Sequence, residues 1–205
     1  MGALAKFDAC SLSFSKAIGD VVTSVTASGN KLTDDERDGY INRAMNKLFT
    51  EYWTAVKGNT EAFIDIFPEL LRDVQVATTA GGLYVLAASG TYDFFKLHSA
   101  YKSTQIIKCV DKTLKAIVVT SNNELYTPST SNFIAIEIEG TIAFYPAASF
   151  NAQAVNIQYV RRPVLSTTGG AFFNDGTVDI PFNANWNDTI VSIALELYKQ
   201  DTQEL

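Results

Sequence analysis

Few side chains in this chain have the types and spacing that catalysis requires. The single histidine, His98, has no HExxH motif and no GxSxG nucleophile turn, so pairing with Cys109 is its one conceivable nucleophilic arrangement. We interpret it instead as an ordinary histidine at a strand end. Glu137 and Glu139 fall on the same face of a predicted strand, where two carboxylates could serve glycoside hydrolysis or bind a metal. A solvated strand face explains them too, and the sequence predicts no enzyme.

Two glycine pairs and one arginine pair are candidate binding motifs. Gly81-Gly82 and Gly169-Gly170 lack the Lys-Ser/Thr of a phosphate-binding loop, so we interpret them as turns. Arg161-Arg162 is the only adjacent basic pair, and it either docks an acidic partner surface or is a solvated strand end. No cofactor and no metal are expected.

Composition and charge narrow the class of protein. The chain has 205 residues, 47% of them hydrophobic, which is enough for one large domain or a domain with a sizeable insertion. Sixteen Lys and Arg stand against 22 Asp and Glu, and the acidic excess lies in residues 1–73 and 181–205. Tight nucleic-acid binding, which needs clustered basic residues, is therefore disfavoured.

The cysteines and the hydropathy pattern indicate the cellular compartment in which the protein is made. The two cysteines, Cys10 and Cys109, have no CxxC spacing, so buried thiols of a protein made inside the cell are favoured over a disulfide. The first ten residues lack the apolar run of a signal peptide, and the longest uncharged run, 74–92, contains polar residues and glycines. Neither a signal peptide nor a membrane span is predicted.

The strongest structural signal is a helix over residues 33–56. Thr33 and Glu36 form a capping-box pair, apolar residues then recur at helical spacing, and Gly58 marks the end. Its wide apolar face must be covered by the segment before it or by the last twenty-five residues. The periodicity also predicts a helix over 12–26 and a third helix from Asn59 or Thr60, which Pro68 kinks or restarts.

The period changes to two after residue 73, which indicates a sheet. The turn 111–113 separates two of its strands. Polar turns between many short strands favour an antiparallel sandwich or small barrel. The candidate strands are 83–87, 93–97, 104–110, 114–120, 133–139, 141–145 and 155–160.

The predicted fold class is therefore α+β. A helical bundle is formed by the N-terminal helices (1–73) and a C-terminal helix (180–205), with the β-sandwich or small barrel inserted between them (74–179). Ile180-Pro181 opens the last element, whose apolar residues from Trp186 to Tyr198 share one helical face that can lie against the long helix. The loop 165–177 contains Phe172 and Phe173, which either belong to an interface or fold back as a lid on the core.

The order of these pieces resembles the head-to-tail connector proteins of short-tailed bacteriophages, of the crAss-like kind among others. The resemblance rests on LTDDERDGYINRAMNKLF with Ile41, Asn42 and Ala44 at its centre, followed by a β insertion. AFYP and VNIQYVRRP, with strand prolines Pro146 and Pro163, and then DIPFNANWNDTIVSIALELYKQD, with Pro181 before its helix, follow in the family's order. It spans nearly the whole chain.

The resemblance implies a structural virion protein, made in the host cytoplasm and located in the neck or tail. Family members form rings, commonly of twelve copies, that dock under the portal, join it to other neck or tail rings, and let DNA pass without sequence-specific binding. No catalytic residue and no membrane contact are implied. The main alternative is a β-sandwich module of a virion that binds carbohydrate or a receptor through exposed aromatics.

Ring contacts favour aromatic anchors and ordered loops over charged pockets. We therefore expect aromatic and basic side chains of the β part and of the C-terminal helix at subunit interfaces. The candidate interface residues are Phe150, Arg161, Arg162, Phe172, Phe173, Trp186 and Tyr198.

Overall fold

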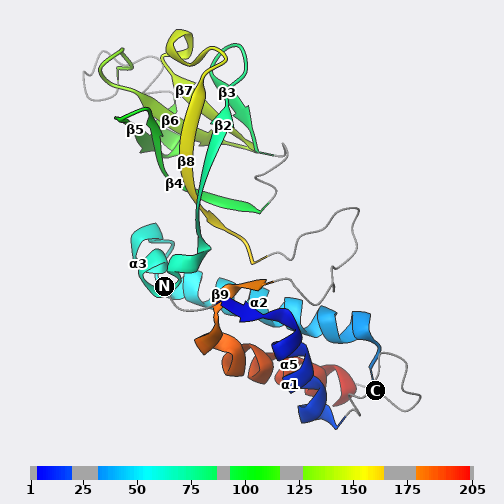
Figure 1. The fold of residues 1–205 in the computed structure, drawn as a ribbon. Helices are drawn as coiled ribbons and strands as arrows, with labels where there is room; N and C mark the ends of the chain where they lie inside the picture. Colours follow the sequence, from blue (N-terminus) through cyan, green and yellow to red (C-terminus); the bar gives the residue numbers. More distant parts are fainter. Residues whose placement is uncertain (1–3, 20–31, 87–92, 116–126, 164–178, 204–205) are drawn as a thin grey trace. The chain divides into compact units, whose positions relative to one another are not determined.

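The computed structural model describes residues 4–19, 32–86, 93–115, 127–163 and 179–203 (Figure 1). The chain has a mixed α/β fold and divides into two compact units. Met1–Leu70 and Arg162–Leu205 form one, here called the helical unit, and Leu71–Arg161 forms the other, the β unit. The sequence predicts this insertion over 74–179, whereas the β unit covers 71–161. The predicted loop 165–177 lies outside the described residues.

The long helix α2 (Asp34–Ala55) begins and ends where the sequence predicts. The Thr33 hydroxyl accepts the Glu36 backbone N–H at 3.3 Å, and the Glu36 carboxylate accepts the Thr33 N–H at 2.7 Å, so the capping box is confirmed. Gly58 takes a left-handed φ of +72° and donates its N–H to the Trp53 carbonyl at 3.1 Å. This bond satisfies one of the carbonyls that the end of a helix leaves open.

Two shorter helices flank α2 in the sequence. Helix α1 (Phe7–Ile18) begins five residues earlier than the predicted helix 12–26, and residues 20–26 lie outside the described residues. Helix α3 (Thr60–Ile66) begins after Asn59, whose side chain accepts the Ala62 N–H, and the 3₁₀ helix η1 (Pro68–Leu70) follows it. The restart at Pro68 is as predicted, because proline lacks the N–H that would continue the helix.

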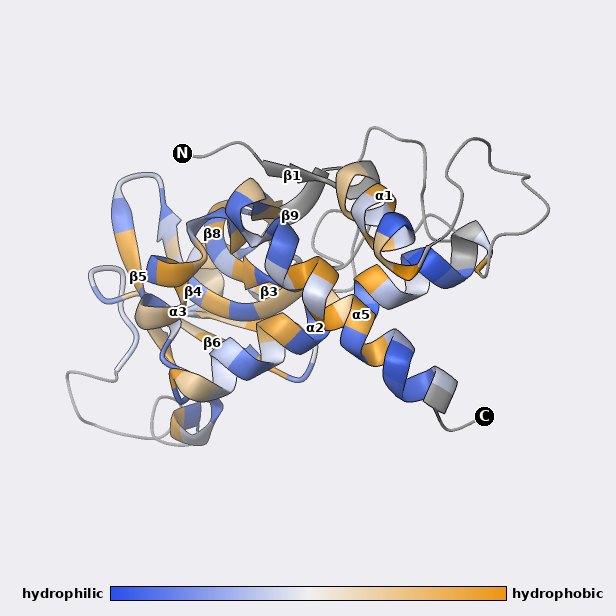
Figure 2. Ribbon diagram, turned by 90° about the horizontal axis from the view of Figure 1, so that it is seen from below, coloured by the Kyte–Doolittle hydropathy of each residue, from blue (hydrophilic) through white to orange (hydrophobic). Residues whose placement is uncertain are grey.

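The C-terminal segment returns to the helical unit. Strand β9 (Asp179–Asn183) pairs antiparallel with β1 (Leu4–Lys6), and the 3₁₀ helix η4 (Ala184–Trp186) leads into α5 (Asn187–Gln203). Helix α5 packs against α1 and α2 (Figure 1). Both α2 and α5 carry hydrophobic and hydrophilic residues in turn along their length (Figure 2), as amphipathic helices do.

Aromatic rings fill the contacts around α2. The Tyr198 ring of α5 lies 5.7 Å from that of Tyr40, and the Trp186 ring lies 5.4 Å from that of Tyr52, both edge to face. Edge-to-face pairs add stabilisation beyond the apolar area that they bury. No described helix is long and apolar enough to cross a membrane.

The β unit contains one seven-stranded sheet that curls into a half-barrel, in the order β2-β8-β4-β5-β6-β7-β3. It begins at Leu71, three residues before the predicted change of period. Strand β4 runs five residues beyond the predicted strand 93–97, and all seven residues of β2 pair with β8. The strands are β2 (Leu71–Ala77), β3 (Leu83–Val85), β4 (Phe94–Lys102), β5 (Gln105–Val110), β6 (Ile134–Ile138), β7 (Thr141–Tyr145) and β8 (Ala154–Arg161).

The sheet is not wholly antiparallel, because β5 and β6 run parallel with Cys109 opposite Ala135. The predicted antiparallel arrangement is wrong here, since the long connection 111–133 lets the chain return before β6 begins. Residues 112–114 form the 3₁₀ helix η2 (Lys112–Leu114), so the predicted strand 114–120 does not begin where expected. Residues 116–120 lie outside the described residues.

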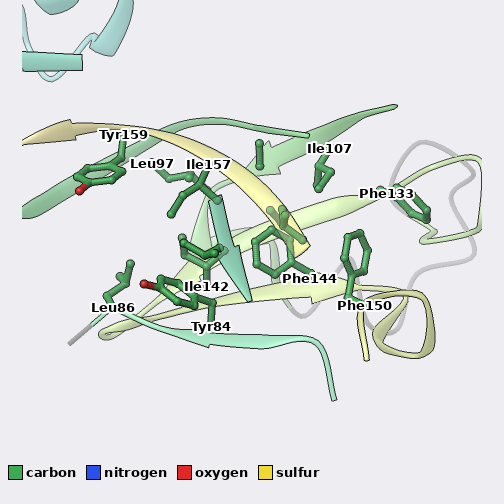
Figure 3. Packing of buried hydrophobic residues seen from close by; sticks show 14 residues of the cluster. Tyr84, Leu86, Leu97, Ile107, Phe133, Ile142, Phe144, Phe150, Ile157 and Tyr159 are labelled. Carbon is green, nitrogen blue, oxygen red and sulfur yellow. The ribbon is translucent and has the colours of Figure 1, made fainter. Parts of the chain in front are cut away.

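The inner face of the curled sheet holds the core of the β unit. Figure 3 shows labelled side chains of β4 and β8 pointing toward those of β3 and β7 across this core. Phe150, from the 3₁₀ helix η3 (Ala147–Phe150), packs at 5.3 Å from the Phe144 ring and 4.8 Å from the Phe133 ring. The buried aromatic and branched aliphatic side chains supply most of the apolar area that stabilises this unit.

Candidate functional site

A hollow of about 470 Å³ lies at the end of the sheet where β4, β5 and β6 meet. It brings together four residues that are separate candidates in the sequence: His98, Cys109, Glu137 and Glu139. Its lining residues are Lys96, Leu97, His98, Cys109, Val110, Asp111, Lys112, Glu137, Glu139 and Gly140.

The hollow forms because β4 and β5 separate. Their pairing runs from Lys102 opposite Gln105 to Ala100 opposite Ile107 and ends there. Beyond that point the Glu137 carboxylate of β6 accepts the Leu97 backbone N–H at 3.3 Å. A side-chain acceptor thus takes the place of a ladder bond, which a buried backbone N–H needs.

Glu137 also pairs with a cation. The Lys96 ammonium lies 3.4 Å from the same carboxylate oxygen, and the two side chains are 40% and 26% exposed. Screening by water at this exposure keeps the contribution of such a pair small. Together with the Leu97 N–H, it holds the Glu137 carboxylate against β4.

Cys109 is a poor nucleophile in this position. The pKa of its thiol is raised to about 12, chiefly by burial, with the Ala100 N–H lowering it and the nearby Glu137 carboxylate raising it by smaller amounts. Nucleophilic cysteines need the thiolate near neutral pH. The described contacts include no hydrogen bond between Cys109 and His98, and His98 lies inside β4 rather than at a strand end.

The two glutamates do not share a strand face. Strand β6 ends at Ile138, and Glu139 with Gly140 forms a two-residue turn before β7, with φ values of +25° and +79°. Such turns match the twist of a hairpin and favour glycine at the second position. The strand placement predicted for Glu139 is therefore wrong. The paired carboxylates of a glycoside hydrolase are not formed as the spacing suggested.

Asp111 closes the hollow on the side of η2. Its carboxylate accepts the Thr113 N–H at 2.9 Å. This bond is the main cause that lowers the pKa of Asp111 below its ordinary value, and the nearby Lys96 and Lys112 charges lower it by smaller amounts. The described residues contain no group of three His, Cys, Asp or Glu side chains that could hold a metal ion. The hollow therefore offers hydrogen-bonding groups of both charges without an activated nucleophile.

The candidate interface residues fall into three groups. Phe150 is fully buried in the core of the β unit, so the surface position expected for it is wrong, and Trp186 and Tyr198 are half-buried among the rings of the helical unit. Arg161 is half-buried at the end of β8, and Arg162 is exposed. Phe172 and Phe173 lie outside the described residues. None of the described five lines the hollow.

Sequence reasoning missed the contribution of Lys96, Asp111 and Lys112 to one site. Lys96 falls in a predicted strand, and Asp111 and Lys112 fall in a predicted turn. Only the placement of β4 and β6 on either side of β5 brings the three residues together. No protein-family model and no curated protein matches this chain.

Charge is distributed unevenly between the two units. The helical unit has nine Lys and Arg against sixteen Asp and Glu, a net charge of −7, whereas the β unit has seven against six, a net charge of +1. The acidic excess seen at both ends of the sequence therefore belongs to a single unit. Like charge at this density repels phosphates and raises solubility.

Proposed function

We propose that the chain is a structural virion protein, a head-to-tail connector subunit that forms a ring under the portal and joins it to the tail. The observation that carries the proposal is the order of elements. A capped helix centred on Ile41, Asn42 and Ala44, a β insertion and a final amphipathic helix follow one another as in the family that the sequence resembles.

The partition of the chain supports this proposal. Both ends of the chain belong to the helical unit, and a β unit of 91 residues, 71 to 161, is inserted between them. In the proposal the helical elements form a small bundle that faces the portal, and the barrel-like β unit faces the tail. A ring of twelve copies would be held by side-to-side contacts that close by rotation.

The charge distribution also favours the connector role. A net charge of −7 on the helical unit would let DNA pass a channel lined by this unit without strong phosphate contacts. In contrast, the hollow of the β unit contains an unreactive thiol, Cys109, and an ion-paired carboxylate, Glu137, and neither favours a catalytic role for the hollow. The chain needs no cofactor for this role.

A carbohydrate- or receptor-binding module is the second candidate, and one observation favours it. The Tyr101 hydroxyl and the Gln158 amide both donate to the Asp73 carboxylate, at 2.9 and 3.0 Å, and these contacts are exposed. A planar aromatic beside a hydrogen-bonding carboxylate and amide is the chemistry that recognises sugars. Binding of a glycan that Tyr101→Ala abolishes would support this alternative.

The deciding experiment is light scattering of the purified chain, alone and mixed with the portal ring of the same virus, followed by negative-stain imaging. A ring stacked coaxially on the portal is expected. A ring formed without portal would place the subunit further along the tail. A monomer that ignores the portal would overturn the connector proposal.

A variant of one candidate interface residue sharpens this experiment. Arg162→Ala changes an exposed residue at the point where the chain passes from the β unit back to the helical unit, and should leave the folded chain intact. If Arg162 docks an acidic partner, the variant binds the portal less tightly, and the loss is larger at low salt than at high salt. Unchanged binding would remove Arg162 from the interface without removing the connector proposal.

A further inference from the structure

We infer that three exposed lysines of the β unit, Lys108, Lys112 and Lys115, form a surface that binds the acidic helical unit of a second copy of the chain. We call this surface the lysine edge. The inference rests on the ring proposed above and identifies one of its subunit contacts. It uses two different surfaces, one on each copy, which is the heterologous arrangement that builds rings.

The lysine edge belongs to the most basic stretch of the chain. Residues 96–115 contain five lysines and a single acidic residue, Asp111. Lys96 pairs with Glu137, and Lys102 donates to the Ser149 carbonyl while lying over the Phe150 ring. Lys108, Lys112 and Lys115 are exposed to solvent.

The geometry of η2 places two of these lysines together. Residues three apart in a 3₁₀ helix eclipse one another, and the Lys115 N–H donates to the Lys112 carbonyl, so both side chains leave the same side of the turn. Asp111 lies beside them, but its carboxylate already accepts the Thr113 N–H. Two like charges side by side repel, and an anionic partner relieves that repulsion.

The helical unit carries the complementary charge. Its net charge is −7, and α3 presents Glu61 and Asp65, four residues apart and both exposed. Residues at this spacing share one face of a helix, and like charges there destabilise it. Glu61 and Asp65 therefore gain from a cationic partner as Lys112 and Lys115 gain from an anionic one. A second copy supplies both surfaces.

The observations favour protein over nucleic acid as the partner of the lysine edge. Nucleic-acid grooves combine many cations with aromatic side chains on which bases stack, and the lysine edge has three cations. Ile106, two residues before Lys108 on β5, is 80% exposed and aliphatic. Polyanion binding is the competing outcome of the test.

Zero-length carbodiimide cross-linking tests the contact directly, because it joins a lysine only to a carboxylate that touches it. Unlabelled and ¹⁵N-labelled full-length chains are mixed in equal amounts, alone and on the portal ring, and cross-linked peptides are identified by mass spectrometry. Peptides that join Lys112 or Lys115 to Glu61 or Asp65 are expected with one labelled and one unlabelled half. Cross-links confined to a single label type, or none, would overturn the inference.

Charge reversal supplies the second measurement. The double variant Lys112→Glu and Lys115→Glu should lose the mixed-label cross-link and should self-associate less than the wild type in sedimentation at low salt. The matched control Lys199→Glu changes an exposed lysine of α5 and should keep both. Combining the double variant with Glu61→Lys and Asp65→Lys should restore them, because the pairs are exchanged. Failure of this restoration contradicts the contact.

The outcomes separate this inference from the connector proposal. A portal-bound ring that forms unchanged with the double variant would overturn the lysine edge and leave the connector function standing. Mixed-label cross-links without any portal binding would support the lysine edge and overturn the connector function. If the double variant loses only binding to heparin or DNA, the lysine edge is a polyanion site and the inference is wrong.

Discussion

Tyr159 donates its phenolic hydrogen to the Asp93 carboxylate at 2.7 Å inside the β unit, where the two residues are 0% and 3% exposed. Arg72 approaches the second carboxylate oxygen at 3.0 Å. Burial, followed by the bond to Asp93, raises the pKa of the Tyr159 hydroxyl far above its ordinary value. Asp93 is a buried acid that tolerates its position because two donors satisfy it.

Replacing Tyr159 by Phe should lower the free energy of unfolding of the β unit by about 1–3 kcal/mol, because one oxygen of a buried carboxylate loses its donor. Tyr101→Phe is the matched control. It removes the same kind of bond, to Asp73 at 2.9 Å, in an exposed position, and surface changes of this kind usually stay within about 0.5 kcal/mol.

Urea unfolding followed by far-ultraviolet circular dichroism measures both variants. Tryptophan fluorescence is unsuitable, since both tryptophans, Trp53 and Trp186, belong to the helical unit. Equal effects of the two substitutions would contradict the role assigned to Asp93.

Gly39 lies in the second turn of α2, and a Cβ added there would meet nothing within 4 Å. Gly39→Ala should raise the free energy of unfolding of the helical unit by about 0.5–1 kcal/mol, because alanine loses less backbone freedom on entering a helix. Here tryptophan fluorescence is the right probe. A decrease in stability would indicate that something in the assembled protein approaches this position closely.

Gly82 should tolerate alanine far less well. Its φ is +72°, and an added Cβ would lie 2.8 Å from the Phe144 carbonyl oxygen and 3.2 Å from the Phe150 Cβ. Gly81, with a φ of +94° and open space around it, is the control for the backbone strain alone. Gly82→Ala should therefore lower the dichroism-detected midpoint more than Gly81→Ala does. Equal midpoints would show that the turn moves to make room.

The pH dependence of the helical unit should include a contribution from Asp201. The hydrogen bond from Arg43 at 2.7 Å, and then the one from Tyr40 at 3.0 Å, lower the pKa of Asp201 below its ordinary value of 3.8. A carboxyl group whose pKa is lower in the folded state stabilises the fold when the pH is above its pKa in the unfolded chain. This stabilisation is lost as the pH falls through its pKa in the folded state.

Acid titrations of the tryptophan fluorescence test this. Asp201→Asn should weaken the helical unit near neutral pH and make its stability fall less steeply below pH 3.8. Asp65→Asn changes an exposed carboxylate for which the described contacts hold no partner, and should keep the wild-type profile. Identical profiles for wild type and Asp201→Asn would refute the prediction.

Local signals in the sequence proved the most informative. The capping box of Thr33 and Glu36, the end of α2 at Gly58 and the restart at Pro68 depend on residues within a turn of one another. Such signals need no knowledge of the rest of the chain. Both cysteines are free thiols, and Cys10 is buried as predicted, whereas Cys109 is only partly buried.

Long-range pairing was out of reach. The parallel register of β5 with β6 depends on a connection of more than twenty residues. Phe150 has the sequence context of a loop residue, but η3 buries its side chain in the core of the β unit. The hollow is also a product of pairing, since it exists only where β4 and β5 part beyond Ala100. Periodicity reports which face a residue takes, and not which strand lies next to it.

Leu71 and Val160 are register partners at the first and nearly the last positions of the β unit. Paired residues of antiparallel strands lie about 5 Å apart, so the inserted segment leaves and rejoins the rest of the chain almost at one point. A recombination event that exchanged 71–161 for another domain with adjacent ends would leave the ends of the helical unit where they are. The β unit is thus free to diverge or be replaced while the helical sequence stays under its own selection.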